Sequence, residues 1–116
     1  MAWQVRVHYK LKFTIMSLRK QFYETKPVCK VTFMLPKDIG NSASRVNLAG
    51  DFNHWNTDSI PMKKLKDGEF TVTIALEKGK EYQFRYLIDG NSWINEQEAD
   101  KLVPNEFQTE NSVVIV

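Results

Sequence analysis

The sequence predicts an all-β domain, an immunoglobulin-like antiparallel β-sandwich of about seven strands, and three observations support this fold class. From residue 28 onward, apolar residues alternate with polar ones in short runs, which is the two-residue period of a half-buried strand. Turn residues separate these runs at intervals of about 8–12 residues, as is typical of sandwiches. No stretch of about ten residues has the 3.6-residue period of an amphipathic helix.

The first two expected strands contain the earliest apolar runs of this region. In residues 29–35 every second side chain is apolar, so cysteine, valine, phenylalanine and leucine share one face. Pro36 ends this strand because proline cannot donate a backbone hydrogen bond, and residues 37–42 are expected to form a polar loop. A second strand is expected over residues 46–50.

A hairpin is predicted next. Residues 60–65 form a short third strand, and Asp67-Gly68 is a dipeptide typical of a tight turn between two antiparallel strands. The fourth strand covers residues 70–76, where large apolar residues alternate with threonine and alanine, so one face is buried and the other solvated. Residues 78–80 then turn the chain again.

The remaining strands follow the same logic. Residues 82–88 place tyrosine, phenylalanine, tyrosine and isoleucine on one face and predict a fifth strand, which Asp89-Gly90 closes with a second turn. Residues 92–94 are expected to form a brief sixth strand. Residues 112–116, rich in valine and isoleucine, form a terminal strand.

The first twenty residues differ from the rest of the chain in charge and pattern. They hold five of the 16 basic residues and none of the 14 acidic ones, so the remainder is mildly acidic and is not expected to bind nucleic acid. Residues 3–15 alternate strictly between apolar and polar side chains. We expect residues 1–20 to be an extension, either an added edge or dimerisation strand or a segment foreign to the natural protein. The domain itself is expected to cover residues 28–116.

The composition excludes several classes of protein. No apolar run approaches the roughly 20 residues that span a bilayer, so no membrane association is expected. Cys29 is the single cysteine, which excludes an internal disulfide and a cysteine-cluster metal site and fits a reducing compartment such as the cytoplasm. A starch-degrading barrel takes about 250 residues, more than twice the length of this chain.

Catalytic chemistry is not indicated either. Asp67 and Asp89 each precede a glycine in a turn, where aspartate forms local backbone hydrogen bonds. Glu96, Glu98 and Asp100 form an acidic loop without the spacing of a calcium-binding loop. No serine, cysteine or histidine lies in the context of an activated nucleophile. The sequence therefore predicts no catalytic residue, no metal site, no cofactor and no enzymatic activity.

Two tryptophans are the remaining candidates for a site. Trp55 and Trp93 each lie in a polar segment just past a predicted strand. An exposed indole can cover the C–H face of a sugar ring, while nearby amide, guanidinium and hydroxyl groups meet the sugar hydroxyls. The alternative is that each indole packs on the sandwich core. In the segment after the predicted strand 46–50, Phe52 is expected in the core, and Asn53 and His54 are expected to shape the turn.

Three segments carry a family resemblance, in order and at the expected spacing. They are Val-Asn-Leu-Ala-Gly-Asp-Phe-Asn-His-Trp at 46–55, Tyr-Gln-Phe-Arg-Tyr-Leu-Ile-Asp-Gly at 82–90 followed by Trp93, and Asn-Ser-Val-Val-Ile-Val at 111–116. Over residues 28–116 the chain closely resembles the glycogen-binding module of AMP-activated protein kinase beta subunits and the early-set domains of isoamylases and branching enzymes, the family-48 carbohydrate-binding modules. As a whole it is similar to small stand-alone bacterial early-set proteins.

The resemblance implies six sugar-contacting residues. Trp55 matches the tryptophan that closes the motif Phe-Asn-x-Trp and would be one stacking platform. Arg85 replaces a lysine of the kinase module, and its planar guanidinium can donate to two hydroxyls. Trp93 matches the second platform, although one extra residue separates it from Gly90 and could re-aim the indole.

The other three implied residues lie near the C-terminal strand. Phe107 stands where the family has a leucine that reaches through the curve of the glucan, so its larger ring either stacks better or obstructs that arrangement. Thr109 and Asn111 match the family's threonine and asparagine as hydroxyl partners. The alternative for these two is a hydrogen bond to backbone at the start of a strand.

Two functions from different classes follow. The first is non-catalytic binding of α-1,4-glucan, glycogen or starch-like, by aromatic stacking and polar contacts. The second is a protein-interaction domain that docks on a glycogen- or starch-active hydrolase or branching enzyme, with the sugar site eroded. A homodimer through the N-terminal strand is a further expectation.

Overall fold

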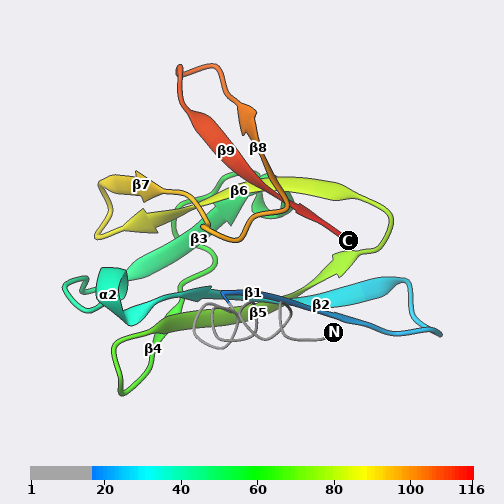
Figure 1. Cartoon of the computed structure of the whole chain (residues 1–116), viewed down its shortest axis with the longest axis horizontal. Coiled ribbons are helices and arrows are strands. Elements are labelled where there is room, and N and C mark those ends of the chain that lie inside the picture. Colours follow the sequence, from blue (N-terminus) through cyan, green and yellow to red (C-terminus); the bar gives the residue numbers. More distant parts are fainter. Residues whose placement is uncertain (1–16) are drawn as a thin grey trace, which may run out of the picture.

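Two antiparallel sheets pack face to face across an apolar core (Figure 1). The computed structural model describes residues 17–116; residues 1–16, which include the alternating segment 3–15, lie outside the described part. One sheet has the strand order β1 (Leu18–Phe22), β2 (Val28–Leu35), β5 (Phe70–Glu77) and β4 (Lys63–Lys64). The other has the order β3 (Val46–Gly50), β6 (Glu81–Ile88), β9 (Glu110–Ile115) and β8 (Lys101–Pro104), and β7 (Ser92–Ile94) also pairs with β6. The predicted all-β sandwich is confirmed.

The alternating side chains of the two sheets form the core as their pattern predicts. Phe33 of β2 meets Phe84 of β6 edge-on, with ring centroids 5.0 Å apart at 74°, and Phe84 in turn meets Tyr86 at 5.9 Å and 80°. All three rings are fully buried. Phe52 packs against this cluster from the loop after β3, as expected. These aromatic contacts fix the two sheets relative to each other.

The expected hairpin forms, with a shorter first strand than predicted. Leu65 donates to the carbonyl of Glu69, and the tight turn at Gly68 closes back on Leu65. Only residues 63–64 belong to β4, because the preceding residues pair with β3 instead: Leu48 donates to the carbonyl of Ile60. Residues 60–64 therefore pass from β3 of one sheet to β5 of the other.

Three elements were not predicted with their observed bounds, although one of them, β1, overlaps the extension 1–20, for which an added edge strand was one expectation. A four-residue helix, α2 (Lys37–Gly40), lies within the expected polar loop. Strands β1 and β8 were missed because Leu18–Phe22 has three polar residues in a row and Lys101–Pro104 has two adjacent apolar ones, so neither shows a two-residue period. Pairing of β1 with β2 places residues 18–22 inside the sandwich, ahead of the expected boundary at residue 28.

Strand β6 has two different neighbours along one of its edges. On one side it pairs with β3 from Phe84 to Ile88. On the other side β9 accompanies it up to Phe84, and β7 takes over from Tyr86. Arg85 therefore lies where one neighbouring strand replaces the other. Its side chain, like that of Gln83, alternates with the core residues and belongs to the outer face of the sheet.

A buried carboxylate fills the inner side of this junction. Glu96 is only 4% exposed and accepts hydrogen bonds from the hydroxyls of Tyr86 and Ser17, while its backbone N–H donates to Ser112 Oγ at 2.9 Å. Asp100, farther along the same acidic loop, pairs with Lys20 Nζ of β1 at 2.7 Å. The acidic loop thus attaches β1 to the opposite sheet. Burial raises the pKa of Glu96, and the hydroxyl hydrogen bonds oppose that rise only in part.

Replacing this carboxylate by its amide, Glu96→Gln, is expected to change how stability depends on pH. Since the folded-state pKa of Glu96 is raised, the folded state binds a proton that the unfolded state releases, and the free energy of unfolding falls as pH rises from the unfolded pKa through the folded one. For one group this slope is at most about 1.4 kcal/mol per pH unit. Urea unfolding of both proteins across acidic to neutral pH measures it.

Subtracting one curve from the other removes the pH dependence that the two proteins share, so the difference reports the replacement of Glu96. As pH rises, the free energy of unfolding of the parent should decline relative to that of Glu96→Gln. Parallel curves would show that Glu96 ionises as readily in the folded chain as in the unfolded one. A uniform loss of stability in the variant would report only the changed hydrogen bonds of the amide.

No helix among residues 17–116 combines the length and the apolar character needed to cross a membrane.

Candidate functional site

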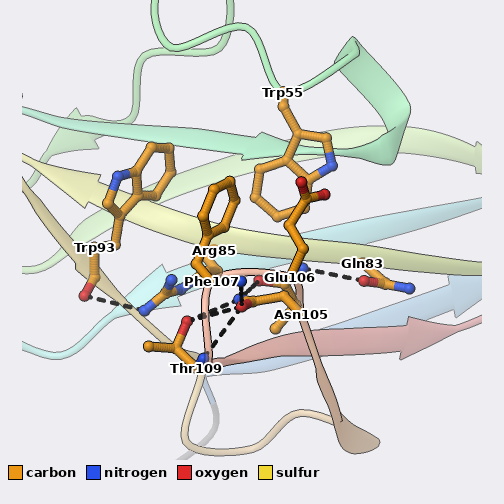
Figure 2. A pocket seen from close by; sticks show the side chains of 9 residues that line it. Trp55, Gln83, Arg85, Trp93, Asn105, Glu106, Phe107 and Thr109 are labelled. Atoms are coloured by element: carbon orange, nitrogen blue, oxygen red, sulfur yellow. Dashed lines mark hydrogen bonds between the residues drawn. The ribbon is translucent and has the colours of Figure 1, made fainter.

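A pocket of about 830 Å³ lies on the outer face of the sheet that contains β6 (Figure 2). Three segments surround it: the loop after β3, strand β7 and the loop between β8 and β9. Its lining residues are Trp55, Gln83, Arg85, Trp93, Asn105, Glu106, Phe107, Thr109 and Asn111. All six residues singled out in the sequence belong to this set. Segments far apart in the chain are thereby brought into one site.

The Trp55 loop is held in shape by an asparagine. After β3 the chain forms one turn of 3₁₀-helix, η1 (Asp51–Asn53). Asn53 Oδ1 accepts the N–H of Gly50 at 2.9 Å, and its Nδ2 donates to the carbonyl of Asn56 at 3.0 Å. His54 and Trp55 then adopt left-handed conformations with φ of 55° and 58°, which are uncommon outside glycine. The expected turn-forming roles of Asn53 and His54 agree with this geometry.

The two indoles meet at an angle. The ring centroids of Trp55 and Trp93 are 6.3 Å apart and their planes are inclined at 62°. Trp93 lies on β7 opposite Leu87 of β6 and is 38% exposed, and Trp55 is half-buried. The extra residue after Gly90 therefore leaves Trp93 on the pocket, because pairing of β7 with β6 fixes its place. The indole faces form two inclined apolar walls.

Arg85 brings a cationic donor into the pocket from β6. One terminal nitrogen, Nη2, lies 3.5 Å from the carbonyl oxygen of Trp93, at the outer limit of a hydrogen bond. Its Nε is buried and has no hydrogen-bond partner among residues 17–116. A buried donor without a partner costs free energy.

The loop between β8 and β9 is organised by Asn105, which the sequence analysis missed. Its Oδ1 accepts the N–H of Phe107 at 2.8 Å, and its Nδ2 donates to Thr109 Oγ1 at 2.8 Å and to Asn111 Oδ1 at 3.0 Å. The signal available in the sequence was an asparagine directly after Pro104, because asparagine is a common turn residue. These bonds hold Phe107 out in solvent, 77% exposed.

Thr109 and Asn111 interact with side chains rather than only with strand backbone. Asn111 is 9% exposed, and its Nδ2 donates to Gln83 Oε1 at 3.0 Å. Gln83 was also missed, although it lies two residues before Arg85 on the same face of β6 and the two-residue period could have found it. Because its oxygen is engaged, Gln83 Nε2 remains as a donor for a ligand.

The charges of the pocket do not form a hydrolytic pair. Glu106, the third residue missed in the sequence, is the single carboxylate among the lining residues, and Arg85 is the single cation. Glycoside hydrolysis ordinarily uses two carboxyl groups on either side of the scissile bond. Within residues 17–116 no group of three or more histidine, cysteine, aspartate or glutamate side chains could hold a metal ion. The arrangement offers flat apolar surfaces bordered by amide, hydroxyl and guanidinium groups, as Figure 2 shows.

Comparison with known proteins agrees with this geometry. A family model described as the glycogen recognition site of AMP-activated protein kinase matches residues 39–116, a span that holds every lining residue of the pocket. The chain is also similar to Protein PTST homolog 2, chloroplastic, from Arabidopsis thaliana, with 42% identity over 50 residues. That match covers 43% of this chain and 9% of the relative. The chain belongs to the family defined by the glycogen recognition site of AMP-activated protein kinase.

Proposed function

We propose that the chain binds α-1,4-linked glucan, glycogen or starch-like, in this pocket and without catalysis. The observation that carries the proposal is the convergence of three aromatic side chains, Trp55, Trp93 and Phe107, around the donors of Arg85 and Gln83. Family membership supports carbohydrate as the class of ligand. The single carboxylate of the pocket supports binding rather than hydrolysis.

The angle between the indoles favours a curved chain over a flat one. Two platforms inclined at 62° cannot both lie flat against a straight ribbon of sugar rings. An α-1,4-linked glucan curves, so its rings present differently tilted faces, whereas a β-1,4-linked glucan is extended and flat. Stacking on Trp55 and Trp93 is therefore expected to select α-linked chains.

Binding of a single sugar is expected to be weak. A small, open stacking site retains about 4 kcal/mol after ordering costs, which corresponds to a dissociation constant of about 1 mM. Longer glucans that cover both indoles should bind more tightly. The affinity should be unaffected by chelators.

Native affinity electrophoresis tests the proposal directly. The full chain is run in gels that contain glycogen, a soluble β-1,4-glucan or no polysaccharide. Retardation in glycogen alone is the expected result. Equal mobility in all three gels, with the chain folded by circular dichroism, would refute glucan binding, and equal retardation in both polysaccharides would refute the selection of α-linked chains.

Replacing Phe107 by alanine is expected to weaken retention in glycogen. If a glucose ring covers about 60 Å² of this exposed phenyl group, the contact contributes about 1.5 kcal/mol. That corresponds to roughly a tenfold loss of affinity. The matched control is Phe22→Ala on β1, which removes another exposed phenylalanine, 55% exposed, outside the pocket. Tighter binding by Phe107→Ala would show that the ring obstructs the glucan.

Several finer points stay predictions. Docking on a glycogen- or starch-active enzyme, dimerisation through the N-terminal segment and a cytoplasmic location are compatible with the family but are not decided by it. Retardation by glycogen would favour the sugar-binding role over an eroded site. Ser17 and β1 are bonded to the sandwich, so we extend the domain to include residues 17–22 ahead of the expected boundary at residue 28.

A further inference from the structure

We propose that Asp51 is a positioning residue that aims the indole of Trp55 into the pocket. Asp51 Oδ1 accepts the indole Nε1–H at 3.1 Å, and Oδ2 accepts the backbone N–H of Gln83 at 2.7 Å. Asp51 is not among the lining residues, so it acts on a ligand through Trp55. This inference rests on the proposed function of the same pocket.

The indole needs such an anchor because of where its backbone lies. Trp55 follows His54 in a left-handed conformation at φ 58°, on a loop that contributes to no strand. Its backbone N–H is fixed by the carbonyl of Gly50 at 2.8 Å, but that bond does not set the side-chain torsions. The bond from Nε1 to Asp51 is the polar contact that selects one orientation of the ring.

The second oxygen of Asp51 ties this orientation to the polar floor of the pocket. Pairing of β3 with β6 ends at Gly50 and Phe84, so the N–H of Gln83 has no partner on β3 and bonds to Asp51 instead. The side chain of Gln83 is in turn bonded to Asn111. One carboxylate thus fixes the distance between the Trp55 platform and the strand that presents Gln83 and Arg85.

Both bonds are made at an exposed position. Because Asp51 is exposed, its carboxylate is well hydrated when these bonds are broken, and their effect on the free energy of unfolding should be small. Their effect on the geometry of the pocket does not depend on burial. Loss of affinity with little loss of stability is therefore the signature of positioning.

The variant Asp51→Asn keeps the shape of the side chain and replaces one acceptor by a donor. Its oxygen can still accept the N–H of Gln83, but its NH₂ group then faces the indole N–H. We expect the affinity for glycogen to fall by about fivefold to tenfold, which corresponds to about 1 kcal/mol, the net size of one ordinary hydrogen bond. The control is Asp58→Asn, which removes the same charge from the same loop, whereas the indole N–H is bonded to Asp51.

A double-mutant cycle separates positioning from a general effect on the loop. Trp55→Phe keeps a flat ring but has no N–H to offer Asp51. In that background Asp51→Asn should change the glycogen affinity by less than about twofold. An equal loss in both backgrounds would overturn the proposal.

A spectroscopic readout follows the indole directly. We expect two indoles 6.3 Å apart and inclined at 62° to couple their transitions and give a paired band in far-ultraviolet circular dichroism. Trp55→Phe and Trp93→Phe abolish this band and calibrate it. Asp51→Asn should reduce it, whereas Asp58→Asn should leave it unchanged.

The two proposals can fail separately. If the parent chain does not bind glycogen, the proposed function is wrong. The circular dichroism band alone then decides whether Asp51 orients the indole. If the parent binds and Asp51→Asn matches it in both affinity and band, Asp51 has no positioning role. Asp51→Ser, whose short hydroxyl cannot reach both partners, provides the same comparison should the amide disturb folding.

Discussion

Replacing Trp55 by alanine is expected to abolish the retardation of the chain in glycogen gels. A sugar that covers roughly 100 Å² of the indole gains about 2.5 kcal/mol from that contact. The corresponding loss of affinity is roughly 50-fold to 100-fold, which should leave no visible retardation. Affinity electrophoresis of the folded variant beside the parent measures the loss.

Three further variants give this result its meaning. Trp55→Phe should keep part of the retention, because a phenyl ring still offers a flat face. Trp93→Ala should lose less than Trp55→Ala, because Arg85 and Gln83 stay in place on β6 and Trp55 stays anchored by Asp51. Phe22→Ala should behave as the parent. A folded Trp55→Ala protein with the parent's mobility shift would show that glucan binds elsewhere or not at all.

The alternation of side chains predicted the interior strands of each sheet and missed two of the edge strands. Residues 29–35, 70–76 and 82–88 show a two-residue period because each strand lies between a core and solvent, and each is a strand in the structure. Strands β1 and β8 each form one edge of a sheet and have neither a long apolar run nor a two-residue period. Their place in the sheet is set by pairing with β2 and β9, which is a tertiary property.

The sequence predicted those site residues whose side-chain type itself suits sugar binding. It did not predict residues that only hold other side chains in place. Trp55 and Trp93 stood out as tryptophans in polar segments, and Arg85 followed from the family motif. Asn105 is an ordinary turn residue in the sequence, and its side-chain hydrogen bonds exist only once the loop has folded. Nothing in a single sequence states that Trp55 has a positive φ.

Placement of the pocket follows from the exchange of neighbours along β6. Pairing of β6 with β9 ends at Phe84, and pairing of β6 with β7 begins at Tyr86. The pocket lies on the outer face of the sheet at this junction. Trp93 enters on β7, and the loop of Phe107 arrives from the base of β9. The same junction is filled on its inner side by Glu96, which is bonded to Tyr86 and Ser112. The buried carboxylate therefore supports the strand that bears Arg85 from beneath.

Adding one methyl group at the end of β3, Gly50→Ala, is expected to produce the largest loss of stability. The new Cβ would lie 2.4 Å from the carbonyl oxygen of Gln83 and 2.7 Å from Cβ of Phe84. The contacted atoms belong to the interior strand β6, which cannot move aside cheaply, so the cost should be about 3 kcal/mol or more. At roughly 4 °C or more per kcal/mol, the melting temperature should fall by more than about 10 °C.

Comparison with Gly79→Ala separates crowding from backbone conformation. Gly50 has an extended backbone with φ of −175°, so alanine there is limited by space alone. Gly79 has φ of 82°, and a methyl group added there would meet nothing within 4 Å, so alanine costs only the strain of about 1–2 kcal/mol. Thermal unfolding should therefore rank Gly50→Ala well below Gly79→Ala. The reverse order would mean that β3 and β6 can separate at Gly50 without loss.

The position of Gly50 also links stability to the site. Its carbonyl accepts the N–H of Trp55 and its own N–H is held by Asn53, so any displacement of the strand end moves the platform loop. At a temperature where Gly50→Ala is still folded, its retention in glycogen should be weaker than that of Gly79→Ala. Parent-like retention in a strongly destabilised Gly50→Ala protein would show that the Trp55 loop keeps its shape independently of the close approach between β3 and β6.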